Sequence, residues 1–185
     1  MNHCVIHIPH ASKLIPDACR DQFSIGEKEL NLEMVKLTDH FTDSMTEGLQ
    51  AVKVVFPYSR LLVDVERFAE DDLEPMSQLG MGVIYENGHK LKKIRRTLTD
   101  DEKIKLFDLY WNYHKRLGKY VDAALQKFNQ CLIIDLHGYP KLNCRTKEVK
   151  VHIRSFALGR TPSTHQKGWS MTFWLPATGF RLKLL

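Results

Sequence analysis

The stretch from Thr99 to Phe128 constrains the fold more than any other part of this sequence. Thr99 and Glu102 have the spacing of a capping box, in which two side chains satisfy backbone N–H groups at the start of a helix. Apolar residues then recur in steps of three and four, which predicts one long helix with a continuous buried seam. The seam consists of Ile104, Phe107, Trp111, His114, Gly118, Val121, Leu125 and Phe128. An apolar run at 131–136 follows and is typical of a buried strand.

The beginning of the chain predicts a strand and a second helix. Residues 4–8 form a short strand-like run that ends at Pro9. Residues 27–49 have helical periodicity. The predicted buried stripe contains Leu30, Met34, Leu37 and Phe41, and Leu32 and Val35 widen it toward Asp39. We therefore expect Asp39 to face the interior.

Two strand-like runs and a long excursion lie between the helices. Residues 52–56 and 61–65 are rich in β-branched and apolar residues, as strands are. Residues 69–98 change from acidic to basic and contain three glycines, which indicates a segment lying over a site or on the surface. This order of elements favours an α/β fold with three layers, in which helices cover both faces of a mixed central sheet. We expect one such domain over residues 1–150.

Charge is distributed unevenly, and its pattern argues against a nucleic-acid partner. The chain carries 27 Lys and Arg against 22 Asp and Glu, a net charge of +5. Residues 138–185 hold nine of the basic residues and one acid, Glu148, so they carry +8 and the remainder carries −3. A basic tail that binds phosphates is one alternative function. The tail lacks, however, the dense basic runs and interleaved aromatic residues of a nucleic-acid groove.

Hydropathy and cysteine usage favour a cytoplasmic protein. No segment approaches the roughly 20 apolar residues of a membrane span, and the first residues do not have the pattern of a secretory signal. The cysteines are Cys4, Cys19, Cys131 and Cys144. The cysteines lack the paired spacing of a metal site, so we expect reduced thiols. The hydropathy of the chain leads us to expect no membrane partner.

Residues of the types that catalyse reactions or bind metal stand near the predicted strands, where α/β proteins place their sites. His10 follows the first strand, and Asp135 and His137 stand two apart at the end of the last, so they share one face. The middle strand is flanked by Arg60, Asp64 and Arg67. Two imidazoles, a carboxylate and a nearby arginine are the composition of an open catalytic zinc site.

Each of these residues also has a purely structural explanation. A single histidine at a strand end stabilises the fold more often than it binds metal, which applies to both His10 and His137. Asp39 would then lie on a solvated helix face. Asp64 and Arg67 would form a surface ion pair of little energetic value.

Four motifs occur in a fixed order along the chain. They are Pro9-His10-Ala11-Ser12 with Ile15-Pro16, Leu37-Thr38-Asp39, residues 59–67 (Ser-Arg-Leu-Leu-Val-Asp-Val-Glu-Arg), and Ile134-Asp135-Leu136-His137. In order and spacing they resemble the N-formylglutamate amidohydrolase family, over about residues 4–140. That family is similar to the zinc carboxypeptidases and aspartoacylases. The resemblance implies a zinc-carboxypeptidase-like hydrolase that removes formyl, or another small acyl group, from an amino acid such as glutamate.

The resemblance also implies a metal site. His10 and His137 are the expected ligands of one zinc ion. The carboxypeptidase-like pattern has a Glu three residues after the first His, but this position is Lys13, so we assign the third ligand to Asp39. Asp135 is expected to contribute to catalysis from beside the ligands, by orienting them or their strand.

The same resemblance implies how a substrate is recognised. Arg67 is the expected partner of a substrate carboxylate, with Arg60 beside it, because the planar guanidinium binds carboxylates bidentately. Glu66 stands where the related pattern has Asn, which places a negative charge beside this clamp. We therefore expect an N-acyl amino acid as the small-molecule partner, with a substrate choice that Glu66 can alter.

The carboxy-terminal part departs from the family pattern. Beyond Cys144 the motifs end, and the expected catalytic Glu, a general base, has no counterpart. We therefore expect an incomplete fold and an atypical, poorly ordered basic tail over residues 151–185. A frameshift near residue 150 and a divergent natural tail are both compatible with this pattern. The alternative function is a non-catalytic homologue that binds metal or a carboxylate ligand without turnover.

Overall fold

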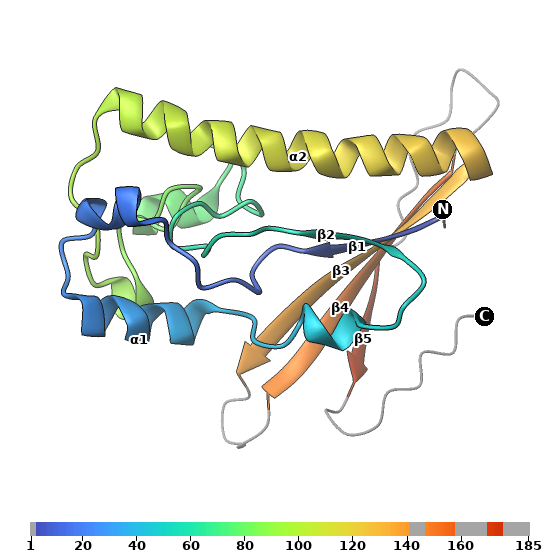
Figure 1. The fold of residues 1–185 in the computed structure, drawn as a ribbon, viewed down its shortest axis with the longest axis horizontal. Helices are drawn as coiled ribbons and strands as arrows, with labels where there is room; N and C mark the ends of the chain where they lie inside the picture. The colour runs from blue at the N-terminus through green and yellow to red at the C-terminus, as the bar shows by residue number, and fades with distance from the viewer. Residues whose placement is uncertain (1–2, 141–146, 158–169, 176–185) are drawn as a thin grey trace. The chain divides into compact units, whose positions relative to one another are not determined.

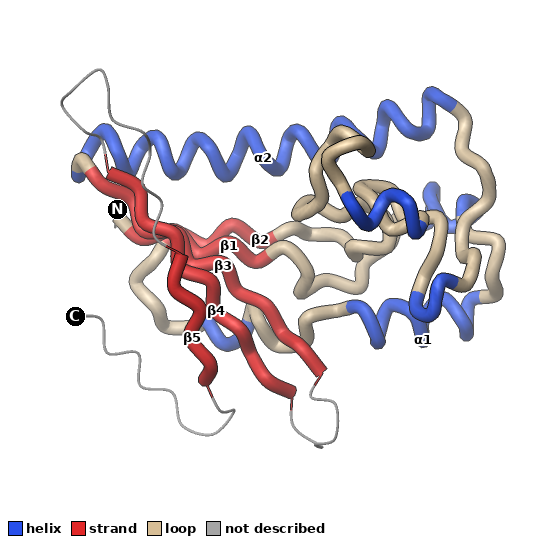
Figure 2. The backbone as a smooth tube through the Cα atoms, turned by 180° about the vertical axis from the view of Figure 1, so that it is seen from behind, coloured by secondary structure: helices blue, strands red, loops and turns tan. Residues whose placement is uncertain are grey.

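The computed structural model describes residues 3–140, 147–157 and 170–175, and it falls into two compact units. The sheet unit comprises Met1–Ile8, Phe41–Val54 and Leu117–Leu185, as far as these are described. The loop unit comprises Pro9–His40 and Val55–Arg116. Most of the backbone between residues 38 and 99, which separate the two α-helices of the described residues, is loop, drawn in tan in Figure 2.

The sheet unit is built on a five-stranded mixed sheet with the strand order β2-β1-β3-β4-β5 (Figure 1). The strands are β1 (Cys4–Ile8), β2 (Val52–Val55), β3 (Gln130–Pro140), β4 (Lys147–Ala157) and β5 (Ser170–Leu175). β1 pairs with β3 in parallel, whereas β3 with β4 and β4 with β5 are antiparallel. The α/β class is thereby confirmed. The three-layer arrangement and the carboxypeptidase-like detail stay predictions.

The two strands predicted from apolar runs form the centre of this sheet. All five residues of β1 are buried, and Ile6 of β1 lies opposite Ile134 of β3. Cys131 is 1% exposed and fills a core position. In the same register His7 lies opposite Asp135, so a polar pair is placed within an apolar parallel ladder.

The long helix α2 (Asp100–Phe128) begins as predicted. The Thr99 amide donates to Glu102 Oε2 at 2.8 Å, and the Glu102 amide donates to Thr99 Oγ1 at 3.3 Å. The predicted seam is wrong in its first half, because Ile104 and Trp111 are 59% and 53% exposed. The buried positions there are Leu106, Tyr110 and Tyr113.

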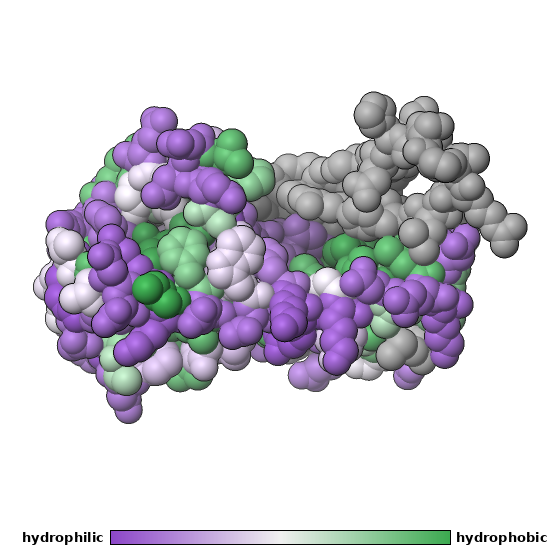
Figure 3. Space-filling model, turned by 90° about the horizontal axis from the view of Figure 1, so that it is seen from above, coloured by the Kyte–Doolittle hydropathy of each residue, from purple (hydrophilic) through white to green (hydrophobic). Residues whose placement is uncertain are grey.

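The physical reason for this shift is that tyrosines occupy the core positions. Tyr110 donates its hydroxyl to the carbonyl of Arg67 at 2.8 Å, so the ring can be buried without an unsatisfied polar group. The predicted seam omitted these tyrosines and therefore followed the neighbouring helix face. The face of the molecule in Figure 3 is mainly hydrophilic, with hydrophobic residues in green among the purple ones.

The first helix, α1, spans Glu27–Leu37 and is much shorter than the predicted 27–49. Thr38 is extended and donates its hydroxyl to the Met34 carbonyl at 2.6 Å, which ends the helix. Phe41 has a positive φ of 68° and is 71% exposed, so its predicted place in the buried stripe is wrong. Asp39 is 6% exposed, as expected, but it lies in the segment after the helix.

Residues 61–65 form a buried loop, although their composition is typical of a strand. Arg95 reaches this loop and donates from Nη2 to the carbonyls of Leu61 and Leu62, the latter at 3.2 Å. A side chain from outside the sheet therefore satisfies backbone groups that a strand would pair with a neighbour.

Two other expectations concern the tail and the membrane. The predicted tail, 151–185, lies partly outside the described residues, and β4 and β5 account for 151–157 and 170–175 within it. The character of the tail therefore stays a prediction. Within the described part of the chain, no helix combines the length and apolarity needed to cross a bilayer.

Candidate active site

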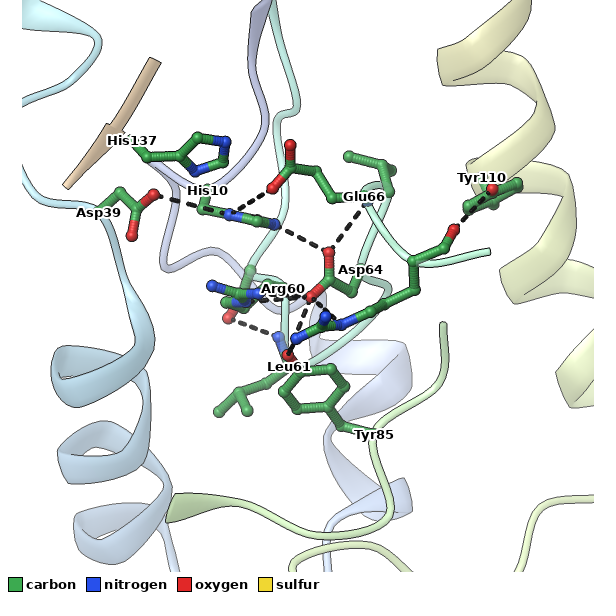
Figure 4. Close-up of polar contacts among 12 residues, drawn as sticks. His10, Asp39, Arg60, Leu61, Asp64, Glu66, Tyr85, Tyr110 and His137 are labelled. Atoms are coloured by element: carbon green, nitrogen blue, oxygen red, sulfur yellow. Dashed lines mark hydrogen bonds and ion pairs between the residues drawn. The ribbon is translucent and has the colours of Figure 1, made fainter. Parts of the chain in front are cut away.

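The loop unit holds His10 in a buried set of carboxylates. Its Nε2 atom lies 2.8 Å from Asp64 Oδ1, and the two residues are 1% and 0% exposed (Figure 4). An ionised carboxylate only accepts hydrogen bonds, so Nε2 must be the donor in this pair. The other ring nitrogen, Nδ1, lies 3.6 Å from Asp39 Oδ2 and 3.6 Å from Glu66 Oε2.

The chain around these residues explains how they meet. His10 comes two residues after β1, where the chain leaves the sheet, and its carbonyl accepts a hydrogen bond from the Asp39 amide at 2.9 Å. The segment after α1 is thereby held against the backbone of His10. The Glu66 amide donates to Asp64 Oδ1 at 3.1 Å, which fixes the turn that carries both acids.

Asp64 is the centre of the polar network shown in Figure 4. Arg60 donates to Oδ2 from Nη2 at 2.7 Å and from Nε at 3.1 Å, and the Tyr85 hydroxyl donates to the same oxygen at 2.9 Å. Burial favours the neutral carboxyl, but Arg60 and His10 outweigh it and hold the pKa of Asp64 well below its usual range. Asp64 is therefore a buried anion, which excludes the surface ion pair considered above.

This anion sets the protonation of its neighbours. Burial alone would lower the pKa of His10, but the carboxylates of Asp64 and Asp39 raise it overall, against the opposing effect of Arg60. Burial, followed by the charge of Asp64, raises the pKa of Tyr85 to about 12. The Tyr85 hydroxyl therefore stays protonated and serves as a donor at neutral pH.

The two predicted substrate-binding arginines differ in their surroundings. Arg60 directs two nitrogens at Asp64, and its side chain is 17% exposed. Arg67 makes longer contacts: Nε lies 3.5 Å from Asp64 Oδ2, and Nη1 lies 3.7 Å from Glu74 Oε1. Its Nη2 donates to the Tyr85 hydroxyl at 3.4 Å. Arg67 has the greater freedom to bind a further carboxylate.

A second polar cluster lies in the sheet unit. Asp135 Oδ1 is 2.7 Å from Nδ1 of His7 and 3.2 Å from Nε2 of His137. All three side chains are buried, His7 on β1 and the other two on one face of β3. Burial favours the neutral acid, but the hydrogen bonds from His137 and His7 prevail and lower the pKa of Asp135.

The structure thus groups the predicted residues in two sets. The loop unit contains His10, Asp39, Arg60 and Arg67, and the sheet unit contains Asp135 and His137. Sequence reasoning did not identify Glu66 as a neighbour of His10, nor His7 or Tyr85 as partners of buried acids. The signal for His7 was available, since it is a polar residue within an otherwise apolar strand. Tyr85 carried no signal, because it lies within the long excursion.

Each unit thus contains a buried histidine–carboxylate pair, and buried titratable groups with perturbed pKa values are candidates for catalytic or metal-binding residues. The chain belongs to the N-formylglutamate amidohydrolase family, whose model matches residues 2–170. It is thus a member of a hydrolase family that acts on amide bonds. The match extends beyond Cys144, where the motifs end, so the expectation that resemblance stops there is wrong. No curated protein and no solved structure matches the chain.

Proposed function

We propose that this protein is a zinc-dependent amidohydrolase that releases formate, or another small acid, from an N-acyl amino acid such as N-formylglutamate. The observation that carries the proposal is the orientation of His10. Its Nε2 is bound to the buried anion Asp64, and its Nδ1 faces the carboxylates of Asp39 and Glu66. Family membership supplies the reaction class.

The donor set of the loop unit suits a zinc ion. A carboxylate that accepts from one imidazole nitrogen fixes the tautomer, so that the other nitrogen becomes the metal ligand. A spacing of 3.6 Å between His10 Nδ1 and Asp39 Oδ2 is close to that of two atoms sharing one zinc at about 2.0–2.1 Å each. We assign the ion to His10 and Asp39, and the resemblance of the sequence motifs adds His137 as the predicted third ligand. A bound zinc ion would act as a Lewis acid that polarises the substrate amide carbonyl.

Arg67 binds and orients the substrate in this proposal. Its guanidinium is anchored by the Asp64 anion and the Tyr85 hydroxyl, and its side chain remains 23% exposed. An arginine held in this way offers a preorganised partner to the carboxylate of an N-acyl amino acid. Arg60 supports it by neutralising Asp64 and adding positive charge. Asp135 acts through His137, to which it is hydrogen-bonded.

Glu66 sets the preference among substrates. Its carboxylate stands next to Arg67 in the chain and 3.6 Å from His10 Nδ1, so it adds negative charge between the metal ligands and the clamp. Such a charge disfavours substrates whose acidic side chain approaches this position. N-formyl amino acids with neutral side chains are therefore substrates to compare with N-formylglutamate.

The proposal is tested by formate release from matched substrates. Zinc-loaded protein should hydrolyse N-formylglutamate and an N-formyl amino acid with a neutral side chain, and hydrolyse the corresponding N-formyl amino acid amides far more slowly. The amides lack the carboxylate that Arg67 binds. Equal rates for acids and amides would contradict recognition of the carboxylate. Zinc binding without hydrolysis of any of them would favour the non-catalytic alternative.

A further inference from the structure

His7 is a buried polar side chain to which the proposed reaction gives no role. It lies on β1, the fully buried central strand, and is 7% exposed. A histidine in such a strand must have a polar partner, since burying an unsatisfied imidazole is costly. Its Nδ1 atom lies 2.7 Å from Asp135 Oδ1.

The strand register explains why this contact is so short. His7 and Asp135 are directly opposite one another in the parallel pair of β1 and β3. Both backbones are fixed by the ladder, so neither side chain has to be ordered from a mobile segment. The contact is therefore a preformed feature of the sheet.

Asp135 joins His7 to His137 through a single oxygen atom. Oδ1 lies 2.7 Å from His7 Nδ1 and 3.2 Å from His137 Nε2. The carboxylate is an acceptor, so both histidines donate to it, His7 from Nδ1–H and His137 from Nε2–H. With Nε2 protonated in neutral His137, Nδ1 is the nitrogen able to coordinate a metal.

We propose that His7 is a positioning residue that locks Asp135 in the rotamer that keeps His137 in its Nε2–H tautomer, with Nδ1 as the ligand atom. This inference rests on the proposed function in one respect only, the expected effect of His7 on zinc affinity. The tautomer itself is a property of the metal-free protein. Partners outside the ligand set typically change metal affinity by about 10- to 100-fold when they are lost.

A similar arrangement of side chains occurs in the loop unit, which supports the role assigned to His7. There Asp64 accepts from Nε2 of His10, and Arg60 and Tyr85 hold the carboxylate from its other oxygen. In the sheet unit, His7 has the role that Arg60 and Tyr85 have for Asp64. Each proposed histidine ligand thus has a buried aspartate, and each aspartate has a further donor that orients it.

Two amide variants test this role because they carry the same amide group and place its N–H at different distances from the backbone. Asn at position 7 puts its amide nitrogen near the place of Nδ1, whereas Gln extends it toward the place of Nε2. His7→Asn should therefore keep the hydrogen bond to Asp135, and His7→Gln should lose it. Circular dichroism and thermal unfolding establish that both variants are folded.

The first readout is the ¹⁵N spectrum of His137 in the metal-free proteins, assigned by its loss in a His137→Asn variant. We expect the Nε2–H tautomer in wild type and His7→Asn, and a mixture of tautomers in His7→Gln. The second readout is zinc affinity by competition with a chelator. It should fall about 10- to 100-fold in His7→Gln and by less than about threefold in His7→Asn.

The two readouts separate this inference from the proposed function. If His7→Gln retains the wild-type tautomer of His137, the positioning role is overturned, whatever the zinc affinity. If the tautomer changes as expected but wild type binds no zinc, the positioning of His137 stands and the proposed function fails. Equal zinc affinities of the two variants, with zinc bound by wild type, would also overturn the role of His7.

Discussion

Asp64 Oδ1 accepts a hydrogen bond from His10 Nε2 at 2.8 Å, deep inside the loop unit. Through its other oxygen the same carboxylate binds Arg60 at 2.7 Å. A proposed metal ligand and the arginine cluster therefore depend on one buried anion. Any change at Asp64 should affect stability, metal binding and substrate binding together.

Asp64→Asn should destabilise the protein strongly. The substitution leaves the guanidinium of Arg60, whose side chain is only 17% exposed, without its counter-charge. Removing one partner of a buried ion pair costs about 3–5 kcal/mol. Urea unfolding should show this loss, with Asp72→Asn as a control because Asp72 is an exposed acid nearby. A loss no larger than that of the control would show that Asp64 does not hold the network.

The raised pKa of Tyr85 predicts a specific pH dependence of the free energy of unfolding. Its pKa rises from 10.0 to about 12 on folding, so an unfolded chain releases this proton at a lower pH than the folded protein. The free energy of unfolding should therefore fall as the pH rises from 10 to 12, by about 2 kcal/mol from this group. The difference between wild type and Tyr85→Phe over this range isolates the contribution. A constant difference from pH 9 to pH 12 would contradict it.

Asp39 and Glu66 compete as the carboxylate ligand, since each lies 3.6 Å from His10 Nδ1. We expect Asp39→Asn to lower zinc affinity beyond the roughly 10- to 100-fold range of residues outside the ligand set, and Glu66→Gln to remain within it. Chelator competition measures both. The reverse order would assign the ligand to Glu66.

Arg67→Ala should weaken substrate binding far more than folding. A charged hydrogen bond contributes about 1.5–3 kcal/mol, so kcat/KM for N-formyl amino acids should fall about 10- to 100-fold, mainly through KM. Arg67→Lys should recover only part of this loss, because an ammonium group cannot bind a carboxylate bidentately. An unchanged KM in Arg67→Ala would exclude the carboxylate role.

Local sequence signals were sufficient for some elements of the fold. The capping box of Thr99 and Glu102 and the apolar runs of β1 and β3 are local patterns. β1 and α2 begin where these patterns predict, whereas β3 begins one residue earlier, at Gln130, and continues to Pro140. The loop at 61–65 could not be recognised, because its backbone is satisfied by Arg95, some thirty positions away. The buried face of α2 was missed because Tyr110 is buried through a hydroxyl contact with Arg67.

The candidate site could likewise be predicted from the sequence only in part. The motifs identified His10, Asp39 and His137 as candidate metal ligands. The structure places Asp39 beside His10 in the loop unit. The residues that orient them, such as His7 and Tyr85, belong to no motif. Their roles depend on strand register and on a long excursion, which a sequence shows only indirectly.

The central claim, zinc-dependent hydrolysis of N-formyl amino acids, is tested most directly by formate release against zinc content. Protein stripped with a chelator and dialysed should be inactive, and activity should return in proportion to zinc up to about one ion per chain. A His10→Ala, His137→Ala double variant should bind no zinc and release no formate. Full zinc occupancy in the double variant, or formate release that does not depend on zinc in wild type, would contradict the account.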